Sequence, residues 1–261
     1  MEPFYSRTDI LKLAYTDQIH LYNADGNDGI KPISGCGHIK GMIFFANGHG
    51  VWIIHSVPGL PIKDKNRFPT TSSTNAQHVV CMNINETMLA VISEHLFDTR
   101  PYYETKIIPA AYLHIGHLRQ IEGKAVKKDS DLGFSSLNLH KQNEESVLIS
   151  EIHSRCNNIE PNEEGVTLKS FWDEVVDSLR SNNEEDEELS VLLQTWTNSK
   201  DRCRSKEHHI KDVTKTTIIE DEKLSWTSGS DHAKYGISTD DRLLFFGDLN
   251  HTVINFDPYI F

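Results

Sequence analysis

Residues 37–56 read GHIKGMIFFANGHGVWIIHS, and this stretch predicts a β-hairpin. Met42–Ala46 is an apolar run of strand chemistry, and Val51–Ile54 is a second. The tetrapeptide Asn-Gly-His-Gly between the two runs is typical of a tight turn. If the runs pair in this way, His38 and His55 lie at the outer ends of neighbouring strands.

A similar arrangement recurs near the other end of the sequence. Residues 231–235 read DHAKY, and Arg242–Phe246 is another apolar run that leads into Gly-Asp-Leu-Asn. Each half of the chain therefore has an apolar strand that follows a His-x-Lys tripeptide. His55 comes 17 residues after His38, and Asn250 comes 18 residues after His232. This internal repeat is the strongest argument that the residues alone provide for a paired functional site.

The His-x-Lys spacing suits phosphoryl transfer. In an extended strand alternate side chains share a face, so the imidazole and the ammonium group point the same way. An imidazole can attack phosphorus or give a proton to a leaving oxygen, and an ammonium group can hold negative charge on phosphate oxygens. Two such units that face each other would supply a nucleophile, a general acid and two cations without a metal ion.

The tripeptide by itself is weak support for this chemistry. With 17 Lys and 14 His in the chain, about one His-x-Lys is expected by chance, and three occur. The third begins at His209, in the charged stretch Lys206–Lys211, which no apolar hairpin follows. We therefore interpret the His209 tripeptide as a surface feature outside any site.

Other elements follow from periodicity. Leu168–Leu179 has apolar residues at helical spacing, and Leu189–Trp196 fits a helix or a strand, with strand favoured near its end. Gly123–Glu164 is polar and poor in strand signals apart from Val147–Ile152, which indicates a connection between two halves. The same reading predicts further strands at His78–Ile84 and at Tyr112–Ile115.

Composition limits the function classes. The mean hydropathy is -0.45, and no run approaches the roughly 18 apolar residues of a membrane helix, so we expect no membrane span. A net charge of -12 at pH 7 argues against binding a polyanion at neutral pH. However, protonation of all 14 His would bring the formal charge to +2, so a nuclease that works in acid escapes this objection.

The cysteines and the first residues of the chain give information about the cellular compartment of the protein. The four cysteines show no Cys-x-x-Cys spacing, which disfavours a zinc ribbon or a thioredoxin-like motif. The start, MEPFYSRTDILKLAY, lacks the charged flank, apolar stretch and cleavage site of a signal peptide. We therefore expect either an intracellular protein or a chain whose N-terminus is incomplete.

The residues around both tripeptides resemble those of the deoxyribonuclease II family. Gly37–Gly41 with Val51–Ser56 is similar to the first motif region of that family, and Asp231–Tyr235 with Gly247–Asn250 is similar to the second. The resemblance implies an α/β (α+β) fold in a single domain over residues 1–261. Its two pseudo-symmetric phospholipase D-like lobes, each a mixed β-sheet flanked by helices, would span about 1–145 and 146–261.

The resemblance also implies an activity. Members of this family are acid endonucleases that hydrolyse DNA without metal or other cofactor, through a phosphohistidine intermediate, in the lysosome or outside the cell. Two histidine and lysine pairs match the catalytic positions: His38 with Lys40, and His232 with Lys234. The matches at supporting positions are His55, Asn250 and Asp248. Asp248 either orients an imidazole or caps the turn, and the sequence does not say which histidine is the nucleophile.

Departures from the family pattern keep two further readings open. Tyr235 and His251 stand where the family commonly has Trp and Arg. One alternative is therefore a catalytically weak or inactive secreted relative that binds DNA or a host partner. A lipid-cleaving phospholipase D is disfavoured, because Phe45 and Thr239 stand where that group has Asp. We expect DNA as the substrate, with the oligomeric state, monomer or homodimer, left open.

Overall fold

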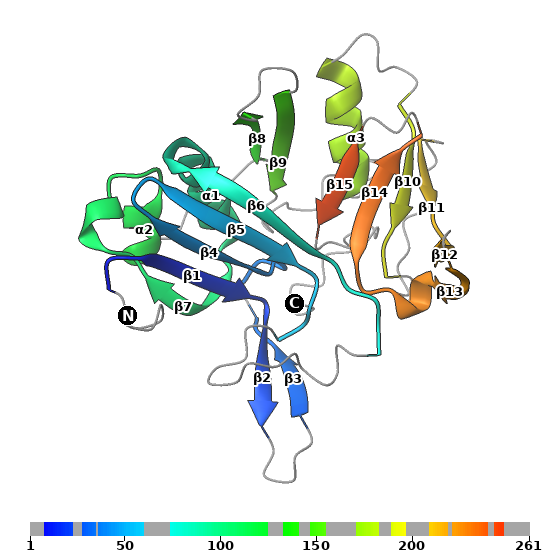
Figure 1. Cartoon of the computed structure of the whole chain (residues 1–261), viewed down its shortest axis with the longest axis horizontal. Coiled ribbons are helices and arrows are strands. Elements are labelled where there is room, and N and C mark those ends of the chain that lie inside the picture. Colours follow the sequence, from blue (N-terminus) through cyan, green and yellow to red (C-terminus); the bar gives the residue numbers. More distant parts are fainter. Residues whose placement is uncertain are drawn as a thin grey trace, which may run out of the picture.

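The computed structural model describes residues 8–22, 28–34, 36–59, 74–124, 133–140, 147–154, 171–182, 189–196, 209–218, 221–239 and 243–247. Within them the chain is mixed α+β, with several sheets and few helices. Figure 1 shows the two larger sheets side by side. Among the helices that the structure describes, none is long and apolar enough to span a bilayer.

The first sheet is antiparallel and has five strands. Its order is β6 (Val79–Asn85), β5 (His49–His55), β4 (Gly41–Ala46), β1 (Leu11–Thr16) and β7 (Tyr102–Ile107). The expected hairpin is confirmed as β4 and β5. Its turn is shorter than the tetrapeptide, because only Asn47 and Gly48 have positive φ, 54° and 81°, and His49 already pairs with Ala46. An Asn-Gly pair favours this two-residue turn.

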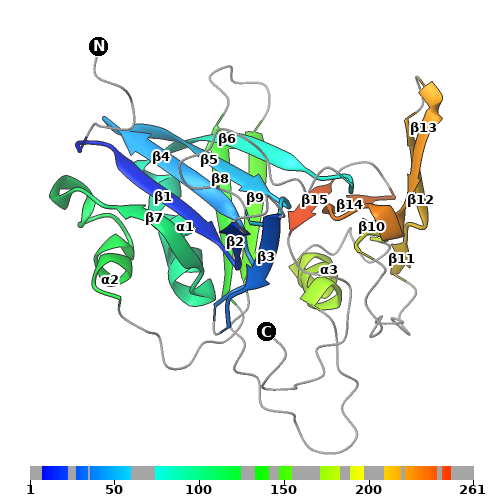
Figure 2. The ribbon, with the colours of Figure 1, turned by 90° about the horizontal axis from the view of Figure 1, so that it is seen from below.

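Two helices complete the core of the first sheet. They are α1 (Glu86–Thr99) and α2 (Leu118–Glu122), and Figure 2 shows both on one face of the sheet. The chain passes directly from β6 into α1, where the Asn85 side chain accepts a hydrogen bond from the Met88 amide at 2.9 Å and caps the helix. Leu89 and Ile92 on α1 are buried with residues of β1, β4 and β5 in one apolar core.

The second sheet has four strands, in the order β11 (Ile210–Asp212), β10 (Val191–Gln194), β14 (Lys234–Ser238) and β15 (Leu244–Gly247). Only β10 and β11 are parallel. Trp172 and Val176 of α3 (Phe171–Asn182) pack against Val191 and Leu193 in a second core. The structure confirms the expected helix as α3, although residues 168–170 lie outside the described residues, and it confirms the expected strands as β6, β10 and β15.

Three two-stranded sheets complete the architecture. They are β2 (Gln18–Tyr22) with β3 (Asp28–Pro32), β8 (Gly133–His140) with β9 (Val147–Ser154), and β12 (Lys215–Ile218) with β13 (Asp221–Thr227). The sequence suggested that the stretch 123–164 is poor in strands apart from Val147–Ile152. Its described residues instead include two paired strands, β8 and β9. The expected strand at Val147–Ile152 is β9, and its partner β8 was missed because its residues are largely polar.

The expected strand at Tyr112–Ile115 was wrong. A 3-10 helix at Ala110–Tyr112 follows Pro109, and the Tyr112 and Ile115 amides donate to Pro109 and Tyr112 carbonyls at 2.9 and 3.0 Å. Proline fixes the start of such a turn. Bonds three residues apart bring Ile115 into the core, so its burial comes from a tight turn and not from a sheet.

Candidate active site

The first His-x-Lys tripeptide lies in the segment between β3 and β4. The Gly37 amide donates to the Arg100 carbonyl at 3.2 Å, and a Cβ at Gly37 would overlap the Thr99 carbonyl oxygen. Only glycine allows the backbone this close to the end of α1. Lys40 immediately precedes β4 and is 1% exposed, whereas His38 keeps a partly exposed ring. The segment is thus held rigidly beside the first core.

Asp17 holds both side chains of this tripeptide, and the sequence reasoning missed it. It follows β1 directly and is buried, with Oδ1 2.9 Å from Lys40 Nζ and Oδ2 in an ion pair with His38 Nδ1. Burial raises the pKa of Asp17, but the hydrogen bond from His38 and the charge of Lys40 together hold it well below its usual range. The available signal was an Asp at the end of the alternating run Leu11–Thr16.

The second tripeptide lies at the start of β14, where a short turn presents it. Asp231 is fully buried, and its carboxylate accepts from Trp226 Nε1 at 2.7 Å and from the Ala233 amide at 3.0 Å. The bond to the Ala233 amide spans His232, and the bond to Trp226 fixes the Asp231 carboxylate beside it. Lys234 is also fully buried, and its Nζ donates to the His232 carbonyl at 2.7 Å.

A main-chain contact joins this turn to the first sheet. Ala76, in the segment before β6, donates to the Ser230 carbonyl and accepts from the His232 amide, both at 2.9 Å. Ser56, at the end of β5, places its carbonyl oxygen 2.9 Å from His232 Nδ1. Ser56 is itself fixed by its hydroxyl, which donates to Gln77 Oε1 at 2.6 Å. The position of the His232 ring therefore depends on the first sheet as well as on the second.

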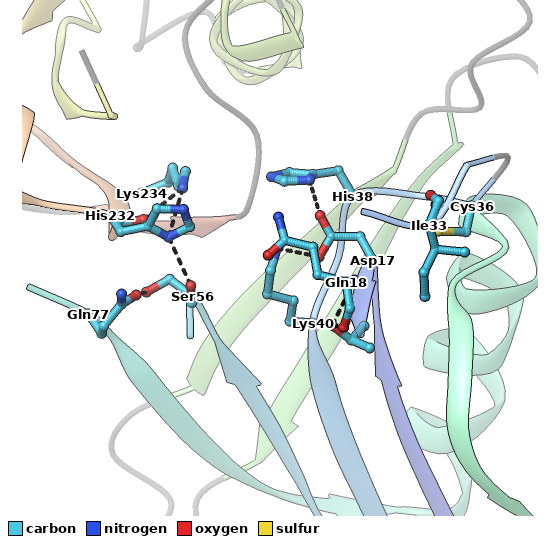
Figure 3. A network of polar contacts seen from close by, with 11 residues as sticks. Asp17, Gln18, Ile33, Cys36, His38, Lys40, Ser56, Gln77, His232 and Lys234 are labelled. Atoms are coloured by element: carbon cyan, nitrogen blue, oxygen red, sulfur yellow. Dashed lines mark hydrogen bonds and ion pairs between the residues drawn. The ribbon is translucent and has the colours of Figure 1, made fainter. Parts of the chain in front are cut away.

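The hydrogen-bond partners define the free nitrogen of each ring. Nδ1 of His232 lies 2.9 Å from the Ser56 carbonyl oxygen, which only accepts, and 3.4 Å from Lys234 Nζ, which only donates. The shorter contact favours a hydrogen on Nδ1, which leaves the lone pair on Nε2 when the ring is neutral. Asp17 likewise accepts from Nδ1 of His38. Both rings are anchored through Nδ1, and Figure 3 shows that they point toward one another from the two sheets, with Lys40 and Lys234 beside them.

His232 is strongly biased toward its neutral form. Burial is the largest cause, and the charges of Lys234 and Lys40 act in the same direction, which lowers the pKa of His232 to about 3. The hydrogen bond to Ser56 opposes this effect only in part, and His38 adds a small contribution in the lowering direction. The structure therefore brings all four expected catalytic residues close enough to interact electrostatically.

The expected supporting residues have different outcomes. His55 is fully buried at the end of β5, and its amide lies 3.4 Å from the Lys40 carbonyl, next to the first tripeptide. Asp248 and Asn250 lie outside the residues that the structure describes. His209 precedes β11, the strand that Figure 1 places at the outer edge of the second sheet, on the side away from the first sheet.

Within the described parts of the chain, no three His, Cys, Asp or Glu side chains are grouped so that they could hold a metal ion. Cys36 and Cys81 are free thiols, and the other two cysteines lie outside the described residues. Among the described residues, the titratable groups around the two rings include Asp17, Asp231, Lys40 and Lys234.

Comparison with known proteins shows a similarity that extends along most of the chain. The model of the family described as deoxyribonuclease II matches residues 1–256. The chain belongs to the deoxyribonuclease II family. It is 24% identical to mouse deoxyribonuclease-2-alpha over 265 residues, a match that covers 96% of this chain and 67% of the mouse protein.

Two nematode relatives match shorter stretches of the chain. Cell death-related nuclease 6 of Caenorhabditis elegans is 36% identical over 86 residues, and deoxyribonuclease-2 of the same species is 31% identical over 109 residues. These matches cover 33% and 41% of this chain. The chain spans only 22% and 29% of the lengths of those two proteins.

Proposed function

We propose that this protein is an endonuclease that hydrolyses DNA phosphodiester bonds through a phosphohistidine intermediate, without a metal ion. The observation that carries the proposal is the facing pair of imidazoles, each anchored through Nδ1 and each accompanied by a buried lysine. A phosphate between the rings would meet a nucleophile on one side and a proton donor on the other. Membership of the deoxyribonuclease II family supports DNA as the substrate.

His232 is the nucleophile in this proposal and His38 is the general acid. The buried, neutral His232 keeps a lone pair on Nε2, which attacks phosphorus to form an N–P bond. As the P–O bond to the leaving nucleotide breaks, its oxygen takes the Nε2 proton of His38. The Asp17 carboxylate balances the positive charge that His38 carries before this transfer.

The second half of the reaction reverses these roles. Neutral His38 removes a proton from water, and the water oxygen attacks the phosphorus of the intermediate. The N–P bond breaks and its electron pair returns to Nε2 of His232. The reaction leaves a phosphomonoester, and both rings recover their starting protonation states.

Lys40 and Lys234 hold the negative charge of the phosphoryl group. Both ammonium groups are almost completely buried, and charge interactions are stronger there than at a solvated surface. Lys40 also bonds Asp17, and Lys234 also bonds the His232 carbonyl, so each ammonium group has a defined position. Two positioned cations can thus provide the charge neutralisation that divalent ions provide in other phosphoryl-transfer enzymes.

We also propose that the enzyme works in acid, in the lysosome or outside the cell, as the family resemblance implies. The chain carries a net charge of -12 at pH 7, which repels DNA, and its 14 histidines gain charge as the pH falls. A low pKa for His232 suits this environment, because the nucleophile stays neutral while other histidines are protonated.

The same proposal extends to the architecture. Each of the two larger sheets contributes one His-x-Lys tripeptide to a shared site, which supports two phospholipase D-like lobes at about 1–145 and 146–261. Such lobes would form one deoxyribonuclease II-like domain, because Ala76 and Ser56 bond directly to residues around His232.

A plasmid-nicking assay at pH 5 in EDTA tests the activity. We expect nicking by the wild-type protein, and a loss on the order of 10⁴-fold or more in His38→Ala and in His232→Ala, because the two rings act as a unit. Circular dichroism would show that both variants are folded.

Near wild-type nicking by either alanine variant would contradict the paired site. Activity that EDTA abolishes and Mg²⁺ restores would contradict the metal-free mechanism. A folded wild-type protein that binds DNA without cutting it would instead favour a catalytically inactive relative.

A further inference from the structure

Trp196 lies against the ring of His232, and no step of the proposed reaction uses it. It follows β10 by two residues and is half-buried, with its ring centroid 4.8 Å from that of His232 and the two ring planes inclined at 57°. The indole Nε1 donates to the Gly229 carbonyl at 3.2 Å, in the turn that leads to His232. The indole is therefore tied to the backbone of the turn and also contacts its imidazole.

The end of β10 is fixed to the same turn by a second side chain. Gln194 is fully buried, and its Nε2 donates to the Thr195 carbonyl at 3.2 Å and to the Asp231 carbonyl at 3.5 Å. Gln194 also pairs with Tyr235 across the antiparallel strands β10 and β14. Trp196 thus lies two residues beyond a strand end that is itself bonded to the turn that carries His232.

We propose that Trp196 is a positioning residue for His232, one that holds the imidazole plane so that Nε2 faces the phosphate and keeps water away from the ring. This inference rests on the proposed function, in which His232 is the nucleophile. The Ser56 carbonyl at 2.9 Å and Lys234 Nζ at 3.4 Å both contact the ring at Nδ1, and contacts at one ring atom leave the ring able to tilt about that atom. The indole, which approaches from the side, removes this freedom.

The same contact suits the covalent intermediate. When Nε2 carries the phosphoryl group and Nδ1 keeps its hydrogen, the imidazole ring bears a positive charge. An aromatic ring within about 6 Å stabilises a cation, and tryptophan is the most effective of the aromatic side chains. Trp196 therefore favours the charged intermediate by an attraction that the neutral starting ring does not experience. The same attraction acts on a protonated His232, so it opposes the larger effect of burial on the pKa of that ring.

The pKa of His232 should depend on the Trp196 indole, because the indole keeps water away from the ring. The groups that act on the ring are Lys234 on β14, Lys40 and His38 before β4, and the Ser56 carbonyl, with Asp17 behind His38. Burial is the largest cause of the low pKa of His232. Removal of the indole would admit water to the ring and weaken that cause, while the two lysines remained in place.

Three substitutions separate the exclusion of water from the His232 ring from the attraction of an aromatic side chain for a charged imidazole. Trp196→Ala removes both effects. Trp196→Leu keeps apolar bulk that excludes water, and Trp196→Phe keeps an aromatic ring as well. Trp172→Phe is the matched control, because Trp172 packs in the core of the same sheet, between α3 and β15. We expect this control to lower the melting temperature without any change at His232.

The measurement is a pH titration of ¹⁵N-histidine-labelled protein by NMR, with the His232 signals assigned by their absence in His232→Gln. We expect the pKa of His232 to rise by roughly one unit in Trp196→Ala, by less in Trp196→Leu, and very little in Trp196→Phe. In parallel we expect kcat for plasmid nicking at pH 4 to fall about 10- to 100-fold in Trp196→Ala, with KM nearly unchanged.

The outcomes are distinguishable because the titration needs no turnover. An unchanged pKa in both Trp196→Ala and Trp196→Leu, or an equal rise in Trp172→Phe, would overturn the inference. A raised pKa in a protein that never cuts DNA would support the contact and overturn the proposed function instead. If Trp196→Ala does not fold, the comparison of Trp196→Leu with Trp196→Phe decides the question.

Discussion

The two His-x-Lys tripeptides have the same composition but different surroundings. His38 leaves 35% of its side chain exposed and donates through Nδ1 to the Asp17 carboxylate. His232 is 5% exposed and donates through Nδ1 to the neutral Ser56 carbonyl, with Lys234 and Lys40 nearby. An anion stabilises a positively charged ring, whereas a dry site beside two cations disfavours one.

In the proposed reaction this difference assigns two unlike functions to a repeated pattern. The tripeptide brings an imidazole and an ammonium group together, and we propose that the atom that faces Nδ1 decides whether the ring serves as an acid or as a nucleophile. Asp17 comes from the end of β1 and Ser56 from the end of β5, so both partners belong to the first sheet. The asymmetry therefore arises from the way in which the second sheet docks against the first.

The largest expected effect concerns the covalent intermediate. A substrate with a p-nitrophenolate leaving group needs no general acid, so His38→Ala should still become phosphorylated and release one equivalent of nitrophenol in a burst. His232→Ala should release none. Stopped-flow absorbance at acid pH would measure the burst, and phosphohistidine mass spectrometry would locate the phosphoryl group.

The reverse pattern, a burst in His232→Ala and none in His38→Ala, would exchange the two assignments. Phosphorylation at neither residue would instead favour direct attack by water. Both results would leave the paired site itself intact.

A smaller effect is expected from Asp17→Asn. The amide keeps the size of the side chain but loses the charge that pairs with His38 and Lys40. We expect kcat to fall about 10²-fold, the usual scale for loss of a group that orients a catalytic residue. Asp212→Asn, at an exposed carboxylate on β11, is the control and should retain full activity. An Asp17→Asn variant with unchanged kcat would show that the carboxylate has only a structural role.

The dependence of kcat/KM on pH should reflect the lowered pKa of His232. The ring must be neutral to attack and its pKa is lowered to about 3, so on the acid side of the profile kcat/KM should fall only below about pH 3. In Lys234→Met a positive neighbour is lost, protonation of His232 becomes easier, and this limb should move to higher pH as the rate falls. Measurement of kcat/KM from pH 2.5 to 8 tests this, and a limb that stays in place would remove Lys234 as a cause.

No effect is expected from His209→Ala. His209 has the same spacing to Lys211 as the other two pairs, but it lies at the outer edge of the second sheet. The plasmid-nicking rate and its pH profile should match those of the wild type. A clear loss of activity would mean that a His-x-Lys tripeptide matters here without a facing partner.

The sequence alone determined several local elements and singled out the four side chains that we propose to be reactive. The hairpin of β4 and β5, the helix α3 and the strand β15 follow from periodicity and from turn residues, which act over short distances. The resemblance to deoxyribonuclease II rested on the residues around His38 and His232, and the family is confirmed. The strands β1, β7 and β8 and the helix α1 were not anticipated, because their patterns are weak without their neighbours.

Only the tertiary structure decided how the reactive side chains differ. Ser56 and His232 are 176 residues apart in the chain and 2.9 Å apart in space, and Asp17 reaches His38 from a strand that the sequence did not predict. Trp196 was indistinguishable from a core residue until its ring was placed against His232. Side-chain periodicity records which face of an element is buried, but the pKa of a group and the tautomer of a ring depend on atoms that folding brings from elsewhere.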